Sequence, residues 1–168
     1  MKPIDVQDYF DLVVKGFSHI KPRETEKMTV FTEDIFKLQW LTRVRFNSFV
    51  TLADELDART FYGYVLDCQG LAKRGSTMFG EPYVCNVVAI CDNADQAAID
   101  YALKRPPKNP RVNTYPVIVD LKKQEVHYYT GPIFYGVIYA KFEREYIDGH
   151  FALPLKALAG TMTTDGLD

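Results

Sequence analysis

The stretch FKLQWLTRVRFN, residues 36–47, constrains the fold most, because its apolar residues recur at every second position. The even-numbered positions of this stretch include the apolar residues Phe36, Leu38, Trp40, Val44 and Phe46. Polar residues fill the other parity, with Leu41 as the exception. A period of two predicts a strand with one buried face. The rival interpretation is a single long helix from Thr32 to Asp57, with Thr32 as its N-cap.

Helical spacing occurs at three other places. Apolar residues recur every three or four positions between Asp5 and Ser18, which predicts a helix there. Ser48 is a suitable N-cap for a short helix ending near Asp57. Residues 92–105 begin with Asp92 or Asn93 as a cap and end before prolines, which predicts a third helix.

Runs rich in Tyr, Val and Ile predict the remaining strands. These runs cover residues 60–68, 82–91, 115–121, 125–130, 134–147 and 150–155. The pair 115–121 and 125–130 flanks a short turn and predicts a hairpin, and Asp148-Gly149 fits a type I′ turn between the last two runs. The polar residues 160–168 are expected to fray.

This order of elements predicts an α+β fold with a mainly antiparallel, curved sheet. An N-terminal helix and one or two further helices would pack on one side of it. The topology loosely resembles the cone-shaped NTF2-like folds, a resemblance that no sequence motif carries. At 168 residues, with no internal repeat or linker, the chain is expected to form a single domain.

Composition narrows the functional classes. The net charge of −2 argues against a surface given over entirely to nucleic acid. No apolar run approaches 18 residues, and the N-terminus carries acids where a signal peptide would be basic, so we expect a cytoplasmic protein that does not bind membranes. The aromatic share of 14% is high and favours wet strand rims or an interface.

The stretch DCQGLAKRGST, residues 67–77, follows a predicted strand and resembles the beginning of a phosphate-binding loop. A P-loop needs a lysine directly after its second glycine and a helix behind it, and Ser76 occupies that place. The prediction is therefore a long surface loop, residues 67–80, in which Lys73 and Arg74 offer an anion contact.

Cysteine and histidine chemistry has weak support. Cys85 and Cys91 would point the same way on one strand but roughly 20 Å apart, too far for one zinc ion or one disulfide. Cys68 could face Cys85, and either could pair with His127 or His150 as a nucleophile. Because no metal-ligand spacing is present, we expect free buried thiols, no metal and no cofactor.

Three further groups of candidates are charged strand positions. Asp120 alternates with the apolar residues of its strand and is expected to face water, although a nuclease-like grouping with Glu125 and a lysine is conceivable. Glu143 and Glu145 would share one strand face. Arg43 and Arg45 lie on the polar parity of residues 36–47 and could contact anions or nucleic acid.

The expected function is a non-catalytic binding or assembly module that acts through an aromatic-rich sheet surface on a protein partner or on its own copies. The first alternative is a small enzyme with a pocket on the sheet built from Cys68, Cys85, Asp120, His127 or His150. The second is anion or nucleic-acid binding through the basic strand face.

Overall fold

The computed structural model describes residues 4–37, 42–75, 83–106, 113–131 and 137–164. At its centre is an open six-stranded sheet in the order β1-β2-β3-β4-β5-β6. The strands are β1 Arg23–Glu24, β2 Thr29–Lys37, β3 Thr42–Leu56, β4 Tyr83–Ala94, β5 Asn113–Asp120 and β6 Glu125–Tyr128. The helices are α1 Val6–Gly16, α2 Ala58–Gly75, α3 Gln96–Leu103, α4 Val137–Ile147, a π-helix over Asp148–Ala152, and α5 Leu153–Thr164.

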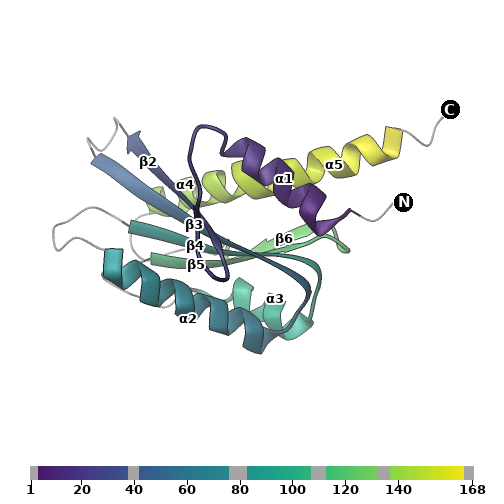
Figure 1. Cartoon of the computed structure of the whole chain (residues 1–168), viewed down its shortest axis with the longest axis horizontal. Helices are drawn as coiled ribbons and strands as arrows, with labels where there is room; N and C mark the ends of the chain where they lie inside the picture. The colour runs from purple at the N-terminus through teal and green to yellow at the C-terminus, as the bar shows by residue number, and fades with distance from the viewer. Residues whose placement is uncertain (1–3, 38–41, 76–82, 107–112, 132–136, 165–168) are drawn as a thin grey trace.

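Helices cover both faces of the sheet (Figure 1). On one face, here called the α2 face, α2 and α3 bury residues such as Phe61 and Ala98. On the other, the α4 face, α1, α4 and α5 bury Val13, Ile147 and Leu155 against the strands. None of the described helices is both long and apolar enough to span a membrane. The predicted α+β class is confirmed, and the prediction that helices pack on one side is wrong.

The sheet is mixed, so the expectation of a mainly antiparallel sheet holds for three of its five strand pairs and fails for the two central ones. β3 pairs with β4 in parallel, and β4 pairs with β5 in parallel, whereas the flanking pairs are antiparallel. Parallel neighbours require a crossover connection, and α2 and α3 supply it. Because both crossovers advance in the same direction and share one hand, both helices lie on the same face. The likeness to NTF2-like folds stays a prediction.

Several predicted elements are confirmed. The first helix begins after Asp5, whose carboxylate accepts hydrogen bonds from the backbone N–H groups of Gln7 and Asp8. The strand predicted over residues 82–91 is β4, and the predicted hairpin is β5–β6. The third predicted helix, α3, begins later than expected, since Asp95 rather than Asp92 or Asn93 caps it.

Three predicted strands are helices instead. Residues 60–68 belong to α2, residues 137–147 form α4, and residues 150–155 continue through the π-helix into α5, so the turn predicted at Asp148-Gly149 does not exist. In α2 the buried residues are spaced by four, three and four positions, a helical pattern. They are Phe61, Val65, Cys68 and Ala72. In α2 the apolar residues therefore cover one side of a helix rather than a pleated face.

The opening stretch, residues 36–47, contains parts of two strands. β2 ends at Lys37 and β3 begins at Thr42, and the two pair antiparallel. Residues 38–41, including Trp40, lie outside the described residues. Both helices considered between Thr32 and Asp57 are wrong, because β3 continues to Leu56. Phe49 faces the α2 side and Val50 the α4 side, so a strand buried on both faces loses its alternation.

Candidate functional site

A buried polar layer lies between the sheet and α4. Ser48 of β3 and Asn86 of β4 are register partners in the middle of the sheet, and both are fully buried. Both have the parity of Val88, so they face α4 within an otherwise apolar surface. From the opposite side α4 contributes Glu143 and Tyr146, which its helical spacing places on the same buried side. Four polar side chains thus meet in the core.

Among the described residues, the Glu143 carboxyl has no ion-pair partner of opposite charge. Its side chain is buried, and burial raises the pKa of Glu143 to about 8, an effect that the neighbouring Asn86 amide opposes. At neutral pH the group is therefore mostly protonated, so that it can both donate and accept a hydrogen bond. Functional sites often contain a buried carboxyl group whose pKa is raised in this way.

The same two residues carry unsatisfied polar atoms. Among the described residues, Asn86 Nδ2 and Oδ1 and Glu143 Oε1 are buried and have no hydrogen-bond partner. The Asn86 amide lies near enough to affect the Glu143 carboxyl, but the geometry falls short of a hydrogen bond. An unsatisfied buried group costs about 1–3 kcal/mol. Three such atoms would use up a large part of the roughly 5–15 kcal/mol that stabilises a typical domain.

Tyr146 connects this layer to the rest of the core. Its ring stacks on Phe46 with centroids 4.4 Å apart, and its hydroxyl lies 3.3 Å from Ser48 Oγ. Burial raises the pKa of Tyr146 well above its usual value. The hydroxyl therefore stays protonated and acts as a neutral hydrogen-bonding group.

Next to Tyr146, two histidines approach one carboxylate. His19 Nε2 lies 3.0 Å from Glu33 Oε1, and His150 Nε2 lies 3.5 Å from Glu33 Oε2. The His150 ring stacks on Phe17 at 4.2 Å. Burial lowers the pKa of His150, and the Glu33 carboxylate opposes that effect. His150 belongs to the π-helix, a feature that often occurs at functional sites.

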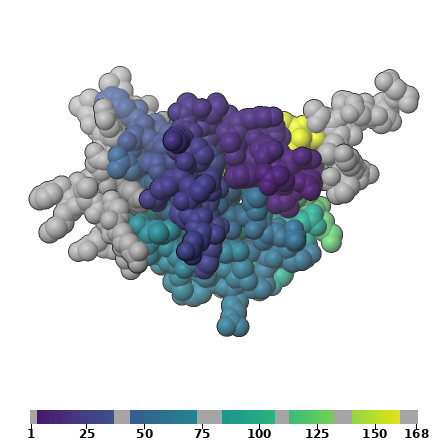
Figure 2. Space-filling model, in the orientation of Figure 1, coloured from purple at the N-terminus to yellow at the C-terminus, as the bar shows by residue number. Residues whose placement is uncertain are grey.

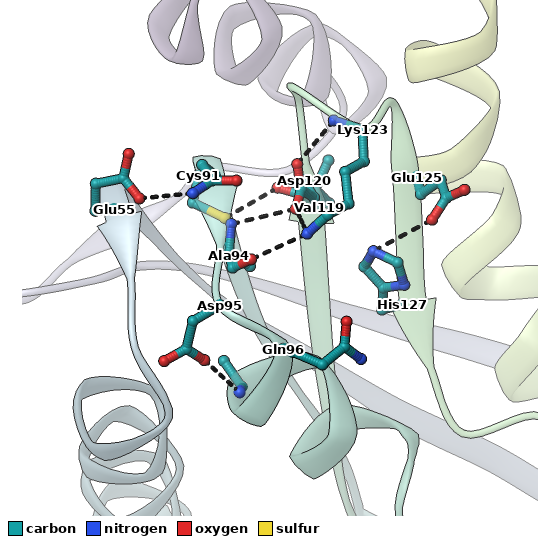
Figure 3. A network of polar contacts seen from close by, with 12 residues as sticks. Glu55, Cys91, Ala94, Asp95, Gln96, Val119, Asp120, Lys123, Glu125 and His127 are labelled. Atoms are coloured by element: carbon teal, nitrogen blue, oxygen red, sulfur yellow. Dashed lines mark hydrogen bonds and ion pairs between the residues drawn. The ribbon is translucent and has the colours of Figure 1, made fainter.

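Asp120 lies at the carboxyl end of β5 and is fully buried, so the expectation that it faces water is wrong (Figure 3). Asp120 does alternate with the apolar residues on the α4 face of its strand, as predicted. The α2 face, to which it points, is covered by helices and not by solvent. Its Oδ1 accepts from the Lys123 backbone N–H at 2.9 Å, and its Oδ2 accepts from Ala94 N at 3.2 Å and Lys123 Nζ at 2.9 Å. Lys123 Nζ also donates to the Ala94 carbonyl. This network joins the ends of β4 and β5 and leaves Asp120 well satisfied.

The other predicted catalytic residues lie in separate surroundings. His127 of β6 is 3.6 Å from Glu125, and burial lowers its pKa (Figure 3). All three cysteines are free and buried on the α2 face. Burial raises the pKa of Cys91 to about 12 and those of Cys68 and Cys85 still further. Among the described residues, no cluster of three or more His, Cys, Asp or Glu side chains is arranged to hold a metal ion.

The predicted anion contacts are split. Lys73 and Arg74 lie in the last turn of α2, so the predicted surface loop over residues 67–80 is wrong as far as Gly75, and residues 76–80 lie outside the described part of the chain. Arg43 belongs to β3, as expected. Arg45 donates to both carboxylate oxygens of Asp34 on β2, at 2.7 and 3.0 Å.

A groove of about 560 Å³ lies between α2 and the turn that precedes β2. In the space-filling view this turn, in dark blue, rests against the teal surface of α2 (Figure 2). The groove is lined by Thr25, Glu26, Lys27, Met28, Leu66, Asp67, Gly70 and Leu71. Lys27 Nζ and Asp67 Oδ2 form an ion pair at 3.1 Å. Leu66 is 47% exposed, and Tyr62, one helical turn earlier, is 48% exposed.

No protein-family model, no curated protein and no solved structure matches this chain. Its function has to be inferred from its own geometry.

Sequence reasoning missed most of the polar layer. Glu143 was considered only together with Glu145, and the helix separates them: Glu143 is buried and Glu145 is exposed. The signal was present in the sequence, because Ala140, Glu143 and Ile147 follow helical spacing. No pattern marks Asn86, which lies inside an apolar run that reads as a continuous buried strand.

Proposed function

We propose that this protein is a non-catalytic assembly module that associates with a second copy of itself through the groove beside α2. The observation that carries the proposal is the combination of this groove with Tyr62 and Leu66, two large apolar side chains about half exposed on neighbouring turns of α2. Large apolar side chains beside a groove are typical of interaction sites.

The location differs from the aromatic sheet surface expected from the sequence. Phe31, Phe46 and Phe49 of the sheet are buried under helices and cannot contact a partner. Tyr62 is an exposed aromatic residue one helical turn before Leu66, which lines the groove, and it packs edge-on against Tyr101 of α3 at 5.7 Å. This contact holds the Tyr62 ring in place, and an anchored ring loses little conformational entropy on binding.

The charges of the groove favour a second copy as the partner. Lys27 and Asp67 carry opposite charges on the two sides of the groove. Both side chains of this ion pair are largely exposed, at 63% and 47%, so the pair can open. In an isologous dimer the same patch meets itself, and the lysine of one copy can then bind the aspartate of the other. A patch that carries both signs is therefore complementary to itself.

The two other functions expected from the sequence have less support. A nucleophilic cysteine requires a thiolate, and burial raises the pKa of both Cys68 and Cys85. Anion binding at the basic strand face requires available charge, and the guanidinium of Arg45 is already engaged by the carboxylate of Asp34.

Light scattering coupled to size-exclusion chromatography tests the proposal. We expect the wild-type chain to approach twice its monomer mass as its concentration rises. Leu66→Lys should remain a monomer at the same concentrations, because it places a charge in the contact. The control is Leu153→Lys on α5, where a leucine 60% exposed lies on the other side of the sheet. A wild-type monomer throughout, or a Leu66→Lys variant that still dimerises, would refute the proposal.

A further inference from the structure

We propose that Asn86 and Glu143 form an internal binding site for a small neutral hydrogen-bonding guest, namely one or two water molecules held between β4 and α4. The site is separate from the groove beside α2, because both residues face the α4 side of the sheet. It therefore does not depend on the proposed assembly function.

The chemistry of the unpartnered atoms defines the guest. Asn86 Nδ2 is a donor, Asn86 Oδ1 is an acceptor, and Glu143 Oε1 belongs to a carboxyl that can do both. Water has two donors and two acceptors and can match all three atoms.

The surroundings favour a neutral guest over an ion. Among the described residues, the groups shown to interact with Glu143 include the neutral side chains of Asn86, Tyr115, Cys85 and Tyr146. An anion would be repelled by the carboxylate form. A cation would require that form, which burial disfavours at neutral pH.

The site also has support from the sheet. Asn86 lies in the central strand β4, between the register partners Ser48 of β3 and Tyr115 of β5. Strands on both sides fix its backbone, so the side chain cannot move far to find another partner. Buried waters occur about once in 27 residues and usually make about three hydrogen bonds, which agrees with the three atoms present here.

A high-resolution crystal structure of the full chain is the direct test. We expect solvent density within about 2.6–3.2 Å of both the Asn86 amide and the Glu143 carboxyl. Density that shows these two groups bonded directly to each other, with no water between them, would overturn the proposal.

An NMR measurement in solution provides a second test of whether water is held at Asn86. The nuclear Overhauser effect between water protons and the side-chain amide protons of Asn86 should have the sign that is characteristic of a water with a long residence time. It should be measured in Glu143→Gln, which lacks an exchangeable carboxyl proton that could mimic the effect. The control is the Asn93 amide, which donates to Glu55 at 2.8 Å near the surface and should show only short-lived hydration. Equal signals at Asn86 and Asn93 would contradict a held water. If Glu143→Gln does not fold, the wild-type density decides alone.

Discussion

Replacing Asp120 with alanine should destabilise the protein more than any comparable change on its surface. The substitution removes an acceptor that serves three hydrogen bonds, one of them from the buried Ala94 N–H. Breaking a buried ion pair from one side typically costs about 3–5 kcal/mol. The value here should lie near the lower end, about 3 kcal/mol, because the Lys123 side chain is 39% exposed and can turn toward water.

Urea denaturation of the full chain measures this effect. With a slope of about 2 kcal/mol per molar urea, a loss of about 3 kcal/mol lowers the midpoint by roughly 1.5 M. The matched control is Glu145→Ala on α4, outside the groove, which breaks an ion pair whose lysine and glutamate are 78% and 56% exposed. That variant should lose less than about 1 kcal/mol. If Asp120→Ala lowers the midpoint no more than Glu145→Ala does, the hydrogen-bond network at the end of β5 does not stabilise the fold as argued.

Three other predictions concern protonation and access. The difference between the pKa of about 8 for folded Glu143 and its ordinary value of 4.5 means that stability should fall by up to roughly 5 kcal/mol as the pH rises from 4.5 to 8. Glu143→Gln should remove most of this slope in urea titrations, and an unchanged slope would show that another group is responsible. The imidazoles of His127 and His150 should titrate below pH 6.5 in NMR spectra, because burial lowers both pKa values. The folded state should therefore lose stability as the pH falls below 6.5. Titration midpoints above 6.5 would contradict the described burial. The three buried thiols should resist a thiol reagent in the folded protein and react fully in denaturant, whereas rapid labelling of the folded chain would show that the α2 face opens readily.

The sequence was most informative where one local signal decided the structure. The first helix has both an apolar stripe and a capping aspartate, Asp5, and both are confirmed. The hairpin β5–β6 has two apolar strands joined by a short polar turn, so its pairing needs no information from the rest of the chain. In each case the local preference and the final environment agree.

The errors come from burial on both sides of the sheet. β3 lies between two other strands and under helices on both faces, so the alternation of its first residues is lost from Ser48 onward, and Phe49, Leu52 and Leu56 follow helical spacing. Conversely, α2 and α4 contain many tyrosines and valines, residues that favour strands, although their buried positions follow helical spacing. In these runs the residue composition favours strands and the periodicity favours a helix, and the structure follows the periodicity.

The candidate site was hard to predict for the same reason. Asp120 was expected to face water because alternation was taken to separate a wet face from a dry one, whereas helices cover both. Asn86 and Glu143 are brought together from strand β4 and helix α4, more than 50 positions apart in the chain. Such a meeting depends on the topology of the whole sheet, which no local pattern contains.

The strand order has a consequence for how the protein acquires its structure. In the described sheet the strands pair with their neighbours in the sequence, so none has to insert between two strands already in place. During synthesis the sheet can therefore grow from β1 to β6 by addition at one edge. The α4 face, however, is completed by the last helices of the chain, which bury Ile147, Phe151 and Leu155. Until these helices emerge, the nascent sheet presents an apolar surface that α1 covers only in part, and during this interval the chain is most exposed to aggregation.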